Sequence, residues 1–458
     1  VHENLLEFIA PAYSVNWADV RRFLQLLQTL CASPDFVQRI GIIREPTTTA
    51  PSQFARIAYH RQQEDEARLS LQEREWRQGI RIWVSTAIEI LTRLGSVLTD
   101  DSATANEVNL SEVEFQVCNY PIQDLHGLLW RVRQHADEQN TRDLSGSTAG
   151  QANDNSRREV GQRNVVRLLM ELMGGTVRRL VKMPATAKAP ARLIAVSGVN
   201  LPARIPVWLC DATAELENLR SVVPGVIDLT PAMHVTAHHR LLQLPDFDIT
   251  RIQQTGPNST VAKALRQLLP MFPNKRRICL FCHSNQVDRI RQSQFANVTM
   301  IHYFHAGIAR GSNSLYREHD CLIILGTPRA GGSGTVIDRL VQLGEIDALN
   351  APPEWGKRAI QITDSRGMTR VIAVKGYAHP VWNRAYNSIV EPELKQIVGR
   401  ARHVLRDGCD VVVVSSHPVA PEFLPFRAIS LTGAQERIGQ ACRQLGGTFA
   451  PRDIQQLT

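Results

Sequence analysis

The sequence predicts an α/β protein in which a domain built on a parallel sheet follows an all-α helical domain. Up to about residue 137, apolar residues recur at helical spacing among charged residues. After Pro190, short continuous apolar runs alternate with helical stretches, which is typical of strands buried on both faces of a parallel sheet.

Length and composition suit a globular protein of two or three domains. The chain has 458 residues, of which 43% are hydrophobic and 21% charged, and its formal net charge of +8 allows a polyanionic partner. Its apolar runs are shorter than the roughly 20 residues that span a bilayer, and no charged-then-apolar leader opens it. We therefore expect a cytoplasmic protein without a membrane partner. Because the first residue is Val1, we expect a piece of a longer protein.

The amino-terminal part divides into three stretches. Residues 1–137 are expected to form the helical domain, which carries no catalytic signature. Residues 138–158 are small and polar, which is typical of a flexible linker. A helical segment, 159–190, is expected to follow, with an amphipathic helix at about 164–181.

The predicted parallel-sheet domain covers residues 191–458. Its strands are expected at five apolar runs: 207–210, 278–281, 298–304, 321–325 and 411–414. A turn at 364–367 between two further apolar runs predicts a β-hairpin set into this domain.

Small polar segments follow the predicted strands, where open α/β sheets bind ligands. They are Asp211–Ala214, His283–Asn285, His305–Asn313 and Gly326–Arg329, and a helix with Gln396 and Arg400 comes after the hairpin. Five such elements in order predict a common ligand edge.

The helix expected over residues 393–406 sorts its side chains into three stripes. One is apolar, from Leu394 to Leu405, and a second carries Lys395, Arg402 and Arg406. The third stripe holds Gln396, Gly399, Arg400 and His403, and its glycine allows a phosphate to approach a guanidinium. We expect this third stripe to face a ligand.

In order and content, these segments resemble the carboxyl-terminal half of superfamily-two helicases. The segment Asp211-Ala-Thr-Ala214 is similar to the family's Ser-Ala-Thr-type coupling motif, and Ala309-Arg-Gly-Ser-Asn313 to its Ala-Arg-Gly-Ile-Asp loop. Most specific is Gln396-x-x-Gly399-Arg400, which resembles the helix that carries an arginine finger. The resemblance covers about residues 194–414 and implies a RecA-like second motor domain.

The resemblance implies a role for each matching residue. Arg400, with Gln396, would act on the transferred phosphoryl group of ATP bound with Mg²⁺. The residues near the nucleotide would be Arg310, Gly311, Asn313, Gly399 and His403, and those that couple hydrolysis to movement Asp211 and Thr213. Ser284, Asn285, Thr327 and Arg329 would contact the phosphates of single-stranded DNA or RNA.

The sequence departs from the family pattern at two of these positions. His403 stands where the family has its second arginine, and Arg402 falls on a different stripe, so we do not expect Arg402 to act as a finger. Asn313 replaces the usual aspartate and keeps an acceptor for a ribose hydroxyl without the charge.

The sequence has neither the Gly-x-x-x-x-Gly-Lys-Ser/Thr loop nor an apolar strand that ends in Asp-Glu. We therefore expect this chain alone to hydrolyse ATP negligibly and to need an amino-terminal RecA-like domain, in the same or another chain. The helical domain would then be an insertion, as in some repair helicases of the iron-sulfur type. The eight cysteines lack the spacing of a cluster site, so no iron-sulfur cluster is expected.

Several further patterns have structural explanations that we favour. Cys279 and Cys282 lie three residues apart on an expected strand and are predicted to be core thiols, and no metal site is predicted. The histidines 234, 238, 239, 302 and 305, the tryptophans 130 and 208, and the turn Gly331–Gly334 are assigned structural roles rather than metal, catalytic, base-stacking or phosphate-binding ones.

Two functional hypotheses remain. The chain is either the carboxyl-terminal part of an ATP-dependent helicase or translocase, or a non-catalytic module that binds nucleic acid or protein through a helicase-like fold. A Gly-Lys-Thr loop and an Asp-Glu box encoded upstream would support the first hypothesis.

Overall fold

The structure is a computed structural model, and its contacts divide the chain into two compact units. The amino-terminal unit comprises Leu6–Val207 and Leu340–Asn350, and the carboxyl-terminal unit Val1–Leu5, Trp208–Arg339 and Ala351–Thr458. The described residues are 6, 9–32, 82, 84–100, 102–113, 149–187, 189–199, 201, 207, 215–229, 238–245, 260–272, 275, 277–304, 314–329, 332–402, 405–419 and 427–428.

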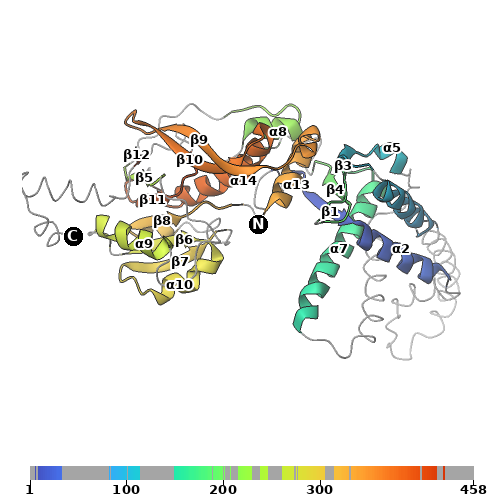
Figure 1. Cartoon of the computed structure of the whole chain (residues 1–458), viewed down its shortest axis with the longest axis horizontal. Coiled ribbons are helices and arrows are strands. Elements are labelled where there is room, and N and C mark those ends of the chain that lie inside the picture. The colour runs from blue at the N-terminus through green and yellow to red at the C-terminus, as the bar shows by residue number, and fades with distance from the viewer. Residues whose placement is uncertain are drawn as a thin grey trace, which may run out of the picture. The chain divides into compact units, whose positions relative to one another are not determined.

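The amino-terminal unit contains a four-stranded antiparallel sheet in the order β1-β4-β3-β2 (Figure 1). Its strands are β1 (Ala12–Asn16), β2 (Asn106–Glu107), β3 (Val177–Met183) and β4 (Arg192–Ser197). Helices α2 (Trp17–Ala32), α5 (Leu110–Val113) and α7 (Ala149–Met173), together with the helical residues 84–99, accompany the sheet. One core joins helices and strands, with Phe23, Leu91, Leu168 and Leu193 among its buried side chains.

This sheet corrects the expectation of an all-α first region. Helix α7 begins at Ala149 and continues to Met173, so the second half of the linker predicted over 138–158 is helical. The helix expected over 164–181 ends early, since Gly175 takes a left-handed φ of 60° and β3 follows. The apolar residues Val177, Leu180 and Val181, read as a helical repeat, are strand residues. The predicted domain limits at 137, 158 and 190 stay predictions.

The carboxyl-terminal unit is built on a six-stranded parallel sheet in the order β12-β5-β11-β8-β6-β7 (Figure 1). The strands are β5 (Leu241–Gln243), β6 (Ile278–Cys282), β7 (Val298–Tyr303), β8 (Cys321–Leu325), β11 (Asp410–Val414) and β12 (Arg427–Ala428). The sheet confirms the expected strands at 278–281, 298–304, 321–325 and 411–414. It belongs to a mixed α/β class that is compatible with a RecA-like domain.

Both faces of this sheet are covered, so its central strands are continuous apolar runs. One face packs against α14 (Pro380–Gly399) and α12 (Leu315–Glu318), with Phe281, Ile324 and Val411 in the shared core. The other packs against α9 (Thr260–Leu268) and α10 (Val287–Gln292), with Leu280, Ile323 and Val412 in that core. The unit also contains α8 (Leu216–Val222), η1 (Leu269–Met271) and η2 (Ser284–Gln286). The boundary between the two units falls within α13 (Ser333–Leu343), and η3 (Asp347–Asn350) belongs to the amino-terminal unit.

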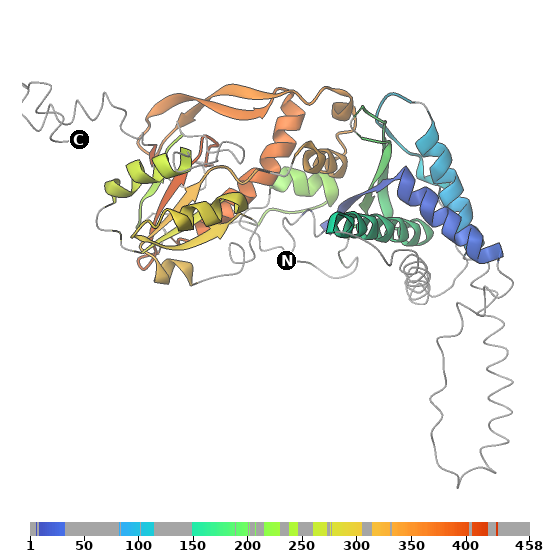
Figure 2. The same cartoon turned by 60° about the horizontal axis from the view of Figure 1, so that its bottom comes forward.

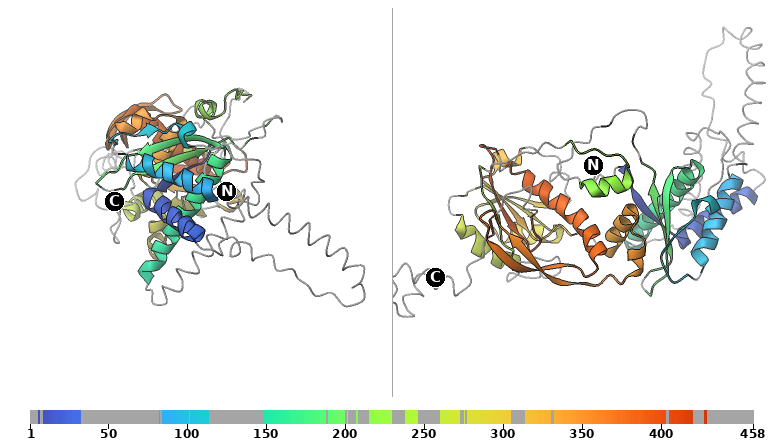
Figure 3. Two further views of the ribbon diagram at one scale, coloured as in Figure 1. Left: turned by 90° about the vertical axis from the view of Figure 1, so that its right-hand side faces the viewer. Right: turned by 90° about the horizontal axis from the view of Figure 1, so that it is seen from above.

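The expected hairpin is confirmed as two nine-residue antiparallel strands, β9 (Trp355–Thr363) and β10 (Thr369–Tyr377). Figure 2 shows it as a long ribbon at the top of the view, and Figure 3 (right) shows it beside α14. Ile362, Ile372 and Val374 on one of its faces join the core formed by α14 and the sheet.

One expected strand and one expected helix in this unit differ from the structure. Val207, expected to begin a buried strand, is 42% exposed and outside any strand; residues 208–210, including Trp208, lie outside the described residues. The helix expected over 393–406 ends at Gly399, and Leu405, expected in the core, is 44% exposed.

The core cysteines are where the sequence placed them. Cys279 and Cys282 are fully buried and point to opposite faces of the sheet, since they belong to its two different cores. Among the described residues, no group of three or more His, Cys, Asp or Glu side chains is arranged to hold a metal ion. In the same part of the chain, no helix is both long and apolar enough to cross a membrane.

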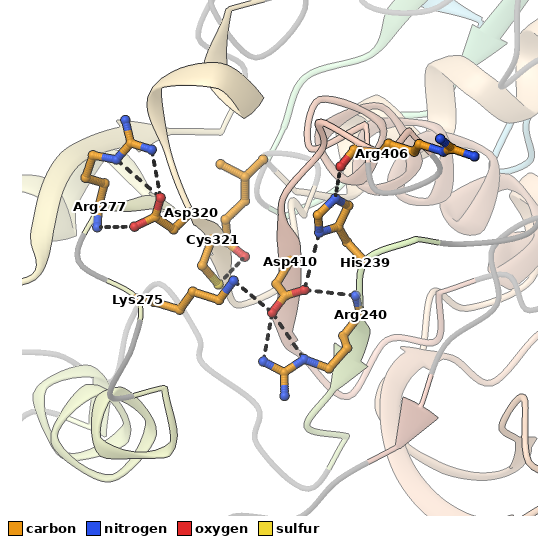
Figure 4. Close-up of polar contacts among 9 residues, drawn as sticks. His239, Arg240, Lys275, Arg277, Asp320, Cys321, Arg406 and Asp410 are labelled. Atoms are coloured by element: carbon orange, nitrogen blue, oxygen red, sulfur yellow. Dashed lines mark hydrogen bonds and ion pairs between the residues drawn. The ribbon is translucent and has the colours of Figure 1, made fainter.

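Asp410, the first residue of the central strand β11, is a buried charge with several cationic partners (Figure 4). Its carboxylate accepts bonds from the Arg240 backbone N (2.9 Å), Nε (3.1 Å) and Nη2 (2.8 Å), and lies 3.2 Å from Lys275 Nζ. Burial alone would raise the pKa of Asp410, but the bonds from Arg240 and the charge of Lys275 outweigh it and lower that pKa. The carboxylate thus ties the amino ends of β5 and β11 to the segment before β6.

Asp410→Asn should lower the free energy of unfolding at pH 7 by about 2 kcal/mol, because it leaves two cations facing a neutral amide; the partial exposure of Arg240 keeps the figure below that of a fully buried pair. The folded pKa is depressed, so this stabilisation is complete above the unfolded pKa and is lost as pH falls through the folded one. Urea unfolding at pH 7 and pH 3 tests this, with the exposed Asp288→Asn as control. A deficit equally large at both pH values would contradict it.

Candidate functional site at the carboxyl edge of the parallel sheet

The connections of the parallel sheet reverse direction between β6 and β8. From β6 the chain goes to β7 on one side, whereas the next strand of this sheet after β8 is β11 on the other side. In open α/β sheets, ligands bind in the crevice beyond the carboxyl ends of the strands at such a reversal. This switch point is flanked by residues 283–286 after β6 and 326–329 after β8, which contain all four predicted nucleic-acid residues.

These four residues differ in accessibility. Ser284 and Asn285 are exposed in the short helix η2, and Arg329 is half-buried, so all three can reach a ligand. Thr327 is only 1% exposed, and its Oγ1 lies 2.8 Å from Ser415 Oγ. The expected contact between Thr327 and a phosphate is therefore wrong, and this hydroxyl instead fixes the loop after β8 to the end of β11.

A buried polar network joins the carboxyl ends of three strands. Gln243 of β5 is fully buried, and its Nε2 donates to the carbonyl oxygens of Ser415 (3.0 Å) and His417 (2.7 Å). The His417 backbone N donates to Ser415 Oγ at 3.0 Å, and Ser415 in turn meets Thr327. Satisfied buried hydrogen bonds of this kind hold a sheet edge in one conformation.

His417 is a buried titratable group in this network. Its Nε2 lies 3.9 Å from Glu391 of α14, and its ring meets that of Tyr386 edge to face at 6.1 Å. Burial, followed by the positive charge of Arg329, lowers the pKa of His417 to about 4 despite the nearby carboxylate. His417 is therefore neutral at pH 7.

The guanidinium of Arg329 lies over the indole of Trp355, 5.8 Å from the ring centre. Trp355, the first residue of β9, is 43% exposed and contacts the rings of Tyr377 and Tyr386 edge to face. Sequence reasoning considered only Trp130 and Trp208 as stacking platforms and missed this one. The signal was a tryptophan two residues before Lys357, at the start of an amphipathic strand.

The loop from β8 to α13 contains a glycine pattern that sequence reasoning also missed. Gly326, Gly331 and Ser333 have the spacing of a nucleotide phosphate loop between a strand and a helix, but Gly332 stands where that loop has lysine. Gly326 and Gly332 adopt φ values of 94° and 130°, which favour glycine. The edge therefore has the glycines of such a loop without its point charge.

Gln396, Gly399 and Arg400 do not lie at the carboxyl edge, which corrects the expectation of one common ligand edge. Glu391 of α14 is beside His417, whereas the turn after Gly399 leads to the amino end of β11, where the Cys409 backbone N donates to the Ala401 oxygen at 2.9 Å. The helix runs opposite to the strand, so its last turn points away from the loops after β6 and β8.

The stripe assignment beyond Gly399 was also wrong. Arg402 has a φ of 47°, which ends the helical repeat, so the calculated separation from Arg400 does not apply. Burial and the charge of Arg402 lower the pKa of Arg400. Leu394, Ile397 and Val398, within the helix, are buried as expected.

The amino edge of the sheet carries a pocket of about 560 Å³. It is lined by Lys275, Arg277, Arg317 and Asp320 among others, and the Arg277 guanidinium lies 2.8 Å from Asp320 (Figure 4). His239, once considered as a metal ligand, lines this pocket and contacts the Arg406 carbonyl at 3.1 Å. Two acids, Asp320 and Asp407, line the pocket with these three cations, and Lys275 also lies 3.2 Å from Asp410.

The other predicted site residues lie outside the described residues: Asp211, Thr213, Arg310, Gly311, Asn313 and His403. Their nearest described neighbour, Glu215, precedes α8. Burial raises the pKa of Glu215, while the charges of Lys395 and Arg339 act to lower it. Lys395 belongs to the turn of α14 that precedes Gln396.

Comparison with solved structures finds chains titled "XPD_Helicase" and "XPD_APO". The first has a TM-score of 0.33 and 10% identity, and the alignment covers 92% of this chain and 65% of that one. The second has a TM-score of 0.30 and 11% identity, with 92% and 73% covered. No protein-family profile and no curated protein matches the chain.

His417→Phe should remove part of the acid sensitivity of this unit while keeping a ring against Tyr386. Since the folded pKa of about 4 is below the usual value, the stability due to neutral His417 is complete above about pH 6.5 and is lost as pH falls toward 4. Between pH 7 and 5 the wild type should lose about 2 kcal/mol more of its unfolding free energy than the variant. Urea titrations at both pH values measure it, and equal losses would show that His417 is accessible to protons in the folded state.

Proposed function

We propose that this chain is the carboxyl-terminal part of an ATP-dependent nucleic-acid helicase or translocase. The carboxyl edge of its parallel sheet binds the phosphates of single-stranded DNA or RNA. The last turn of α14 contributes Arg400 and Gln396 to an ATP site that an amino-terminal RecA-like domain, in the same or another chain, completes.

The observation that carries this proposal is the topological switch point between β6 and β8. Two exposed polar side chains after β6 and Arg329 after β8 flank the point where the sheet reverses direction. A guanidinium and small polar groups are the usual partners of phosphates, and they position a strand without reading its bases. The hydrogen bonds that join the carboxyl ends of β5, β8 and β11 hold the loop after β8 in place beside this switch point.

The nucleotide side of the proposal rests on the end of α14. A side chain added at Gly399 would meet no atom within 4 Å, so this position leaves room beside Gln396 and Arg400. The sequence resemblance assigns these residues to an arginine-finger helix, and a finger acts by placing positive charge against the phosphate in the transition state. Bound Mg²⁺ would neutralise phosphate charge, and its ligands, like the lysine of the phosphate loop, would come from the other domain.

A two-sided arrangement suits a translocating domain. Nucleic acid and nucleotide are linked by one helix, α14, in which Glu391 lies 3.9 Å from both Lys395 and His417. Movement at the nucleotide end of α14 would reach the nucleic-acid edge through these contacts. The coupling residues Asp211 and Thr213 are proposed on this basis.

The glycine at the lysine position of the loop after β8 favours a second candidate. A domain with the glycine spacing of a phosphate loop but without its lysine is what a non-catalytic binding module with a helicase-like fold would contain. ATP hydrolysis stimulated by single strands, in the longer protein, separates the two candidates.

The chain should bind single-stranded oligonucleotides weakly and with strong salt dependence, because most contacts are to phosphates. Arg329→Gln should weaken binding about threefold to tenfold and reduce the slope of log affinity against log salt by about 0.7, the value for one contact on a single strand. Fluorescence anisotropy at several salt concentrations measures both. Arg291→Gln, an exposed arginine of α10, is the charge-matched control. An affinity that does not change between low and moderate salt would refute the nucleic-acid edge.

In the longer protein, Arg400→Ala should lower ATP hydrolysis by on the order of 10³ with ATP binding changed only a few-fold, since a finger acts mainly in the transition state. Gly399→Ala should leave the melting temperature unchanged or raised, because the space is open, yet impair hydrolysis if a nucleotide approaches there. Gly408→Ala, whose methyl would collide with the Arg402 carbonyl, is the contrasting structural control and should destabilise the fold. Full activity of Arg400→Ala would remove the nucleotide from α14.

A further inference from the structure

The β9–β10 hairpin has one buried and one outward face. Strand residues alternate, so Ile362, Ile372 and Val374 enter the core, while the residues between them point away. On the outward face the register pairs Lys357 with Lys375 directly across the two strands. We call the outward residues Trp355, Lys357, Ala359, Gln361, Val371, Ala373 and Lys375 the ribbon face.

The hairpin concentrates positive charge. Residues 355–377 contain five basic side chains and one acidic one, a net charge of +4 against +8 for the whole chain. The register places two of the five, Lys357 and Lys375, on the ribbon face, and Arg358 and Arg370 on the opposite face. The acid, Asp364, lies in the turn 2.7 Å from Arg366 and is therefore already paired. Like charges directly opposite on a sheet destabilise it. An anion against Lys357 and Lys375 would relieve that repulsion.

An aromatic ring stands at the end of the same face. Trp355 precedes Lys357 by two residues, so about 7 Å of strand separates them on one face. Its indole is held edge to face by Tyr377 at 4.8 Å and by Tyr386 at 5.1 Å, and it remains 43% exposed. The Arg329 guanidinium lies over this ring. Because Arg329 follows β8, it connects the ribbon face with the switch point between β6 and β8.

We propose that the ribbon face is a second contact surface for a single nucleic-acid strand, with Lys357 and Lys375 on its phosphates and Trp355 stacked on one base. The proposal rests on the proposed nucleic-acid function and extends it to a part of the molecule with no counterpart among the predicted site residues. Basic side chains combined with an exposed aromatic ring are what sequence-tolerant single-strand binding requires. In this proposal, the nucleic-acid strand passes from the switch point between β6 and β8 over Arg329 and Trp355 to the hairpin.

The test measures binding of the chain to a fluorescent oligothymidylate and to the same oligonucleotide with abasic sites. The double variant Lys357→Gln/Lys375→Gln should weaken binding about tenfold and reduce the salt slope by about 1.4, two phosphate contacts' worth. Trp355→Ala should lose about tenfold for the normal strand and little for the abasic one, since stacking needs a base. Trp355→Phe should recover most of that loss.

A gain-of-function variant keeps the test independent of folding defects. Val371 is 73% exposed on the ribbon face, so Val371→Lys should fold normally, bind the oligonucleotide more tightly and increase the salt slope by about 0.7. The charge-matched control is Arg220→Gln/Arg291→Gln, in two helices away from the hairpin. Circular dichroism melts verify that each variant is folded.

The outcomes separate this proposal from the proposed function. A wild-type chain that does not bind the oligonucleotide at low salt overturns both. If the wild type binds and Arg329→Gln weakens that binding, but the ribbon-face variants lose no more affinity than the control pair, the ribbon face alone is overturned. Equal loss of affinity for the normal and abasic strands in Trp355→Ala overturns the stacking role. Binding of phosphatidylserine vesicles or polyglutamate that depends on Lys357 and Lys375, without any effect on the oligonucleotide, replaces the strand with another anionic partner.

Discussion

The carboxylate of Asp410 is the interaction on which the carboxyl-terminal unit depends most. Parallel strands cannot be joined by tight turns, so nothing in the local chain fixes their relative heights. Asp410 supplies that reference at the amino edge, because it binds the backbone and side chain of Arg240 before β5 and Lys275 before β6. The polar network around Gln243 does the same at the carboxyl edge. Between these two layers the central strands β6, β8 and β11 are apolar.

This division of labour explains why the two predicted ligand surfaces are stable and separate. Polar groups concentrate where strands begin and end, and α14 spans the distance between the edges with a buried stripe. Exposed residues at the carboxyl edge, such as Ser284 and Asn285, can therefore vary in charge without disturbing the core. In the hairpin, likewise, Ile362, Ile372 and Val374 join the core, whereas Lys357 and Lys375 lie on the opposite face.

Sequence patterns were sufficient where one physical signal dominated. The apolar runs of β6, β8 and β11 have no helical period and are bounded by polar residues, so both their strand character and their burial followed. The hairpin followed from the turn at Asp364, whose carboxylate accepts bonds from the backbone N of Arg366 and Met368. At the site, the position of Ser284 and Asn285 after a buried strand followed from the apolar run before them.

The failures have equally specific causes. Strand β3, with Val177, Leu180 and Val181, carries the spacing of a helix, and only pairing with distant β4 makes it a strand. The wheel of residues 393–406 assumed a continuous helix, which the left-handed conformation of Arg402 interrupts. Thr327 was assigned to a ligand because its partner Ser415 lies 88 residues away in the sequence. Trp355 was overlooked because its exposure depends on how the hairpin meets α14.

The buried cysteines give this sheet a built-in reporter of its own opening. Cys279, Cys282 and Cys321 lie in β6 and β8, and Cys409 immediately precedes β11. Burial raises the pKa of Cys282 and of Cys409 to about 12 and raises those of the other two thiols as well, so none forms the reactive thiolate while its strand is in place. Alkylation at each position would consequently occur only during transient separation of that strand. The alkylation rates of the four sulfurs would rank the strands by how often they separate from the sheet, and so show which part of the sheet opens most often.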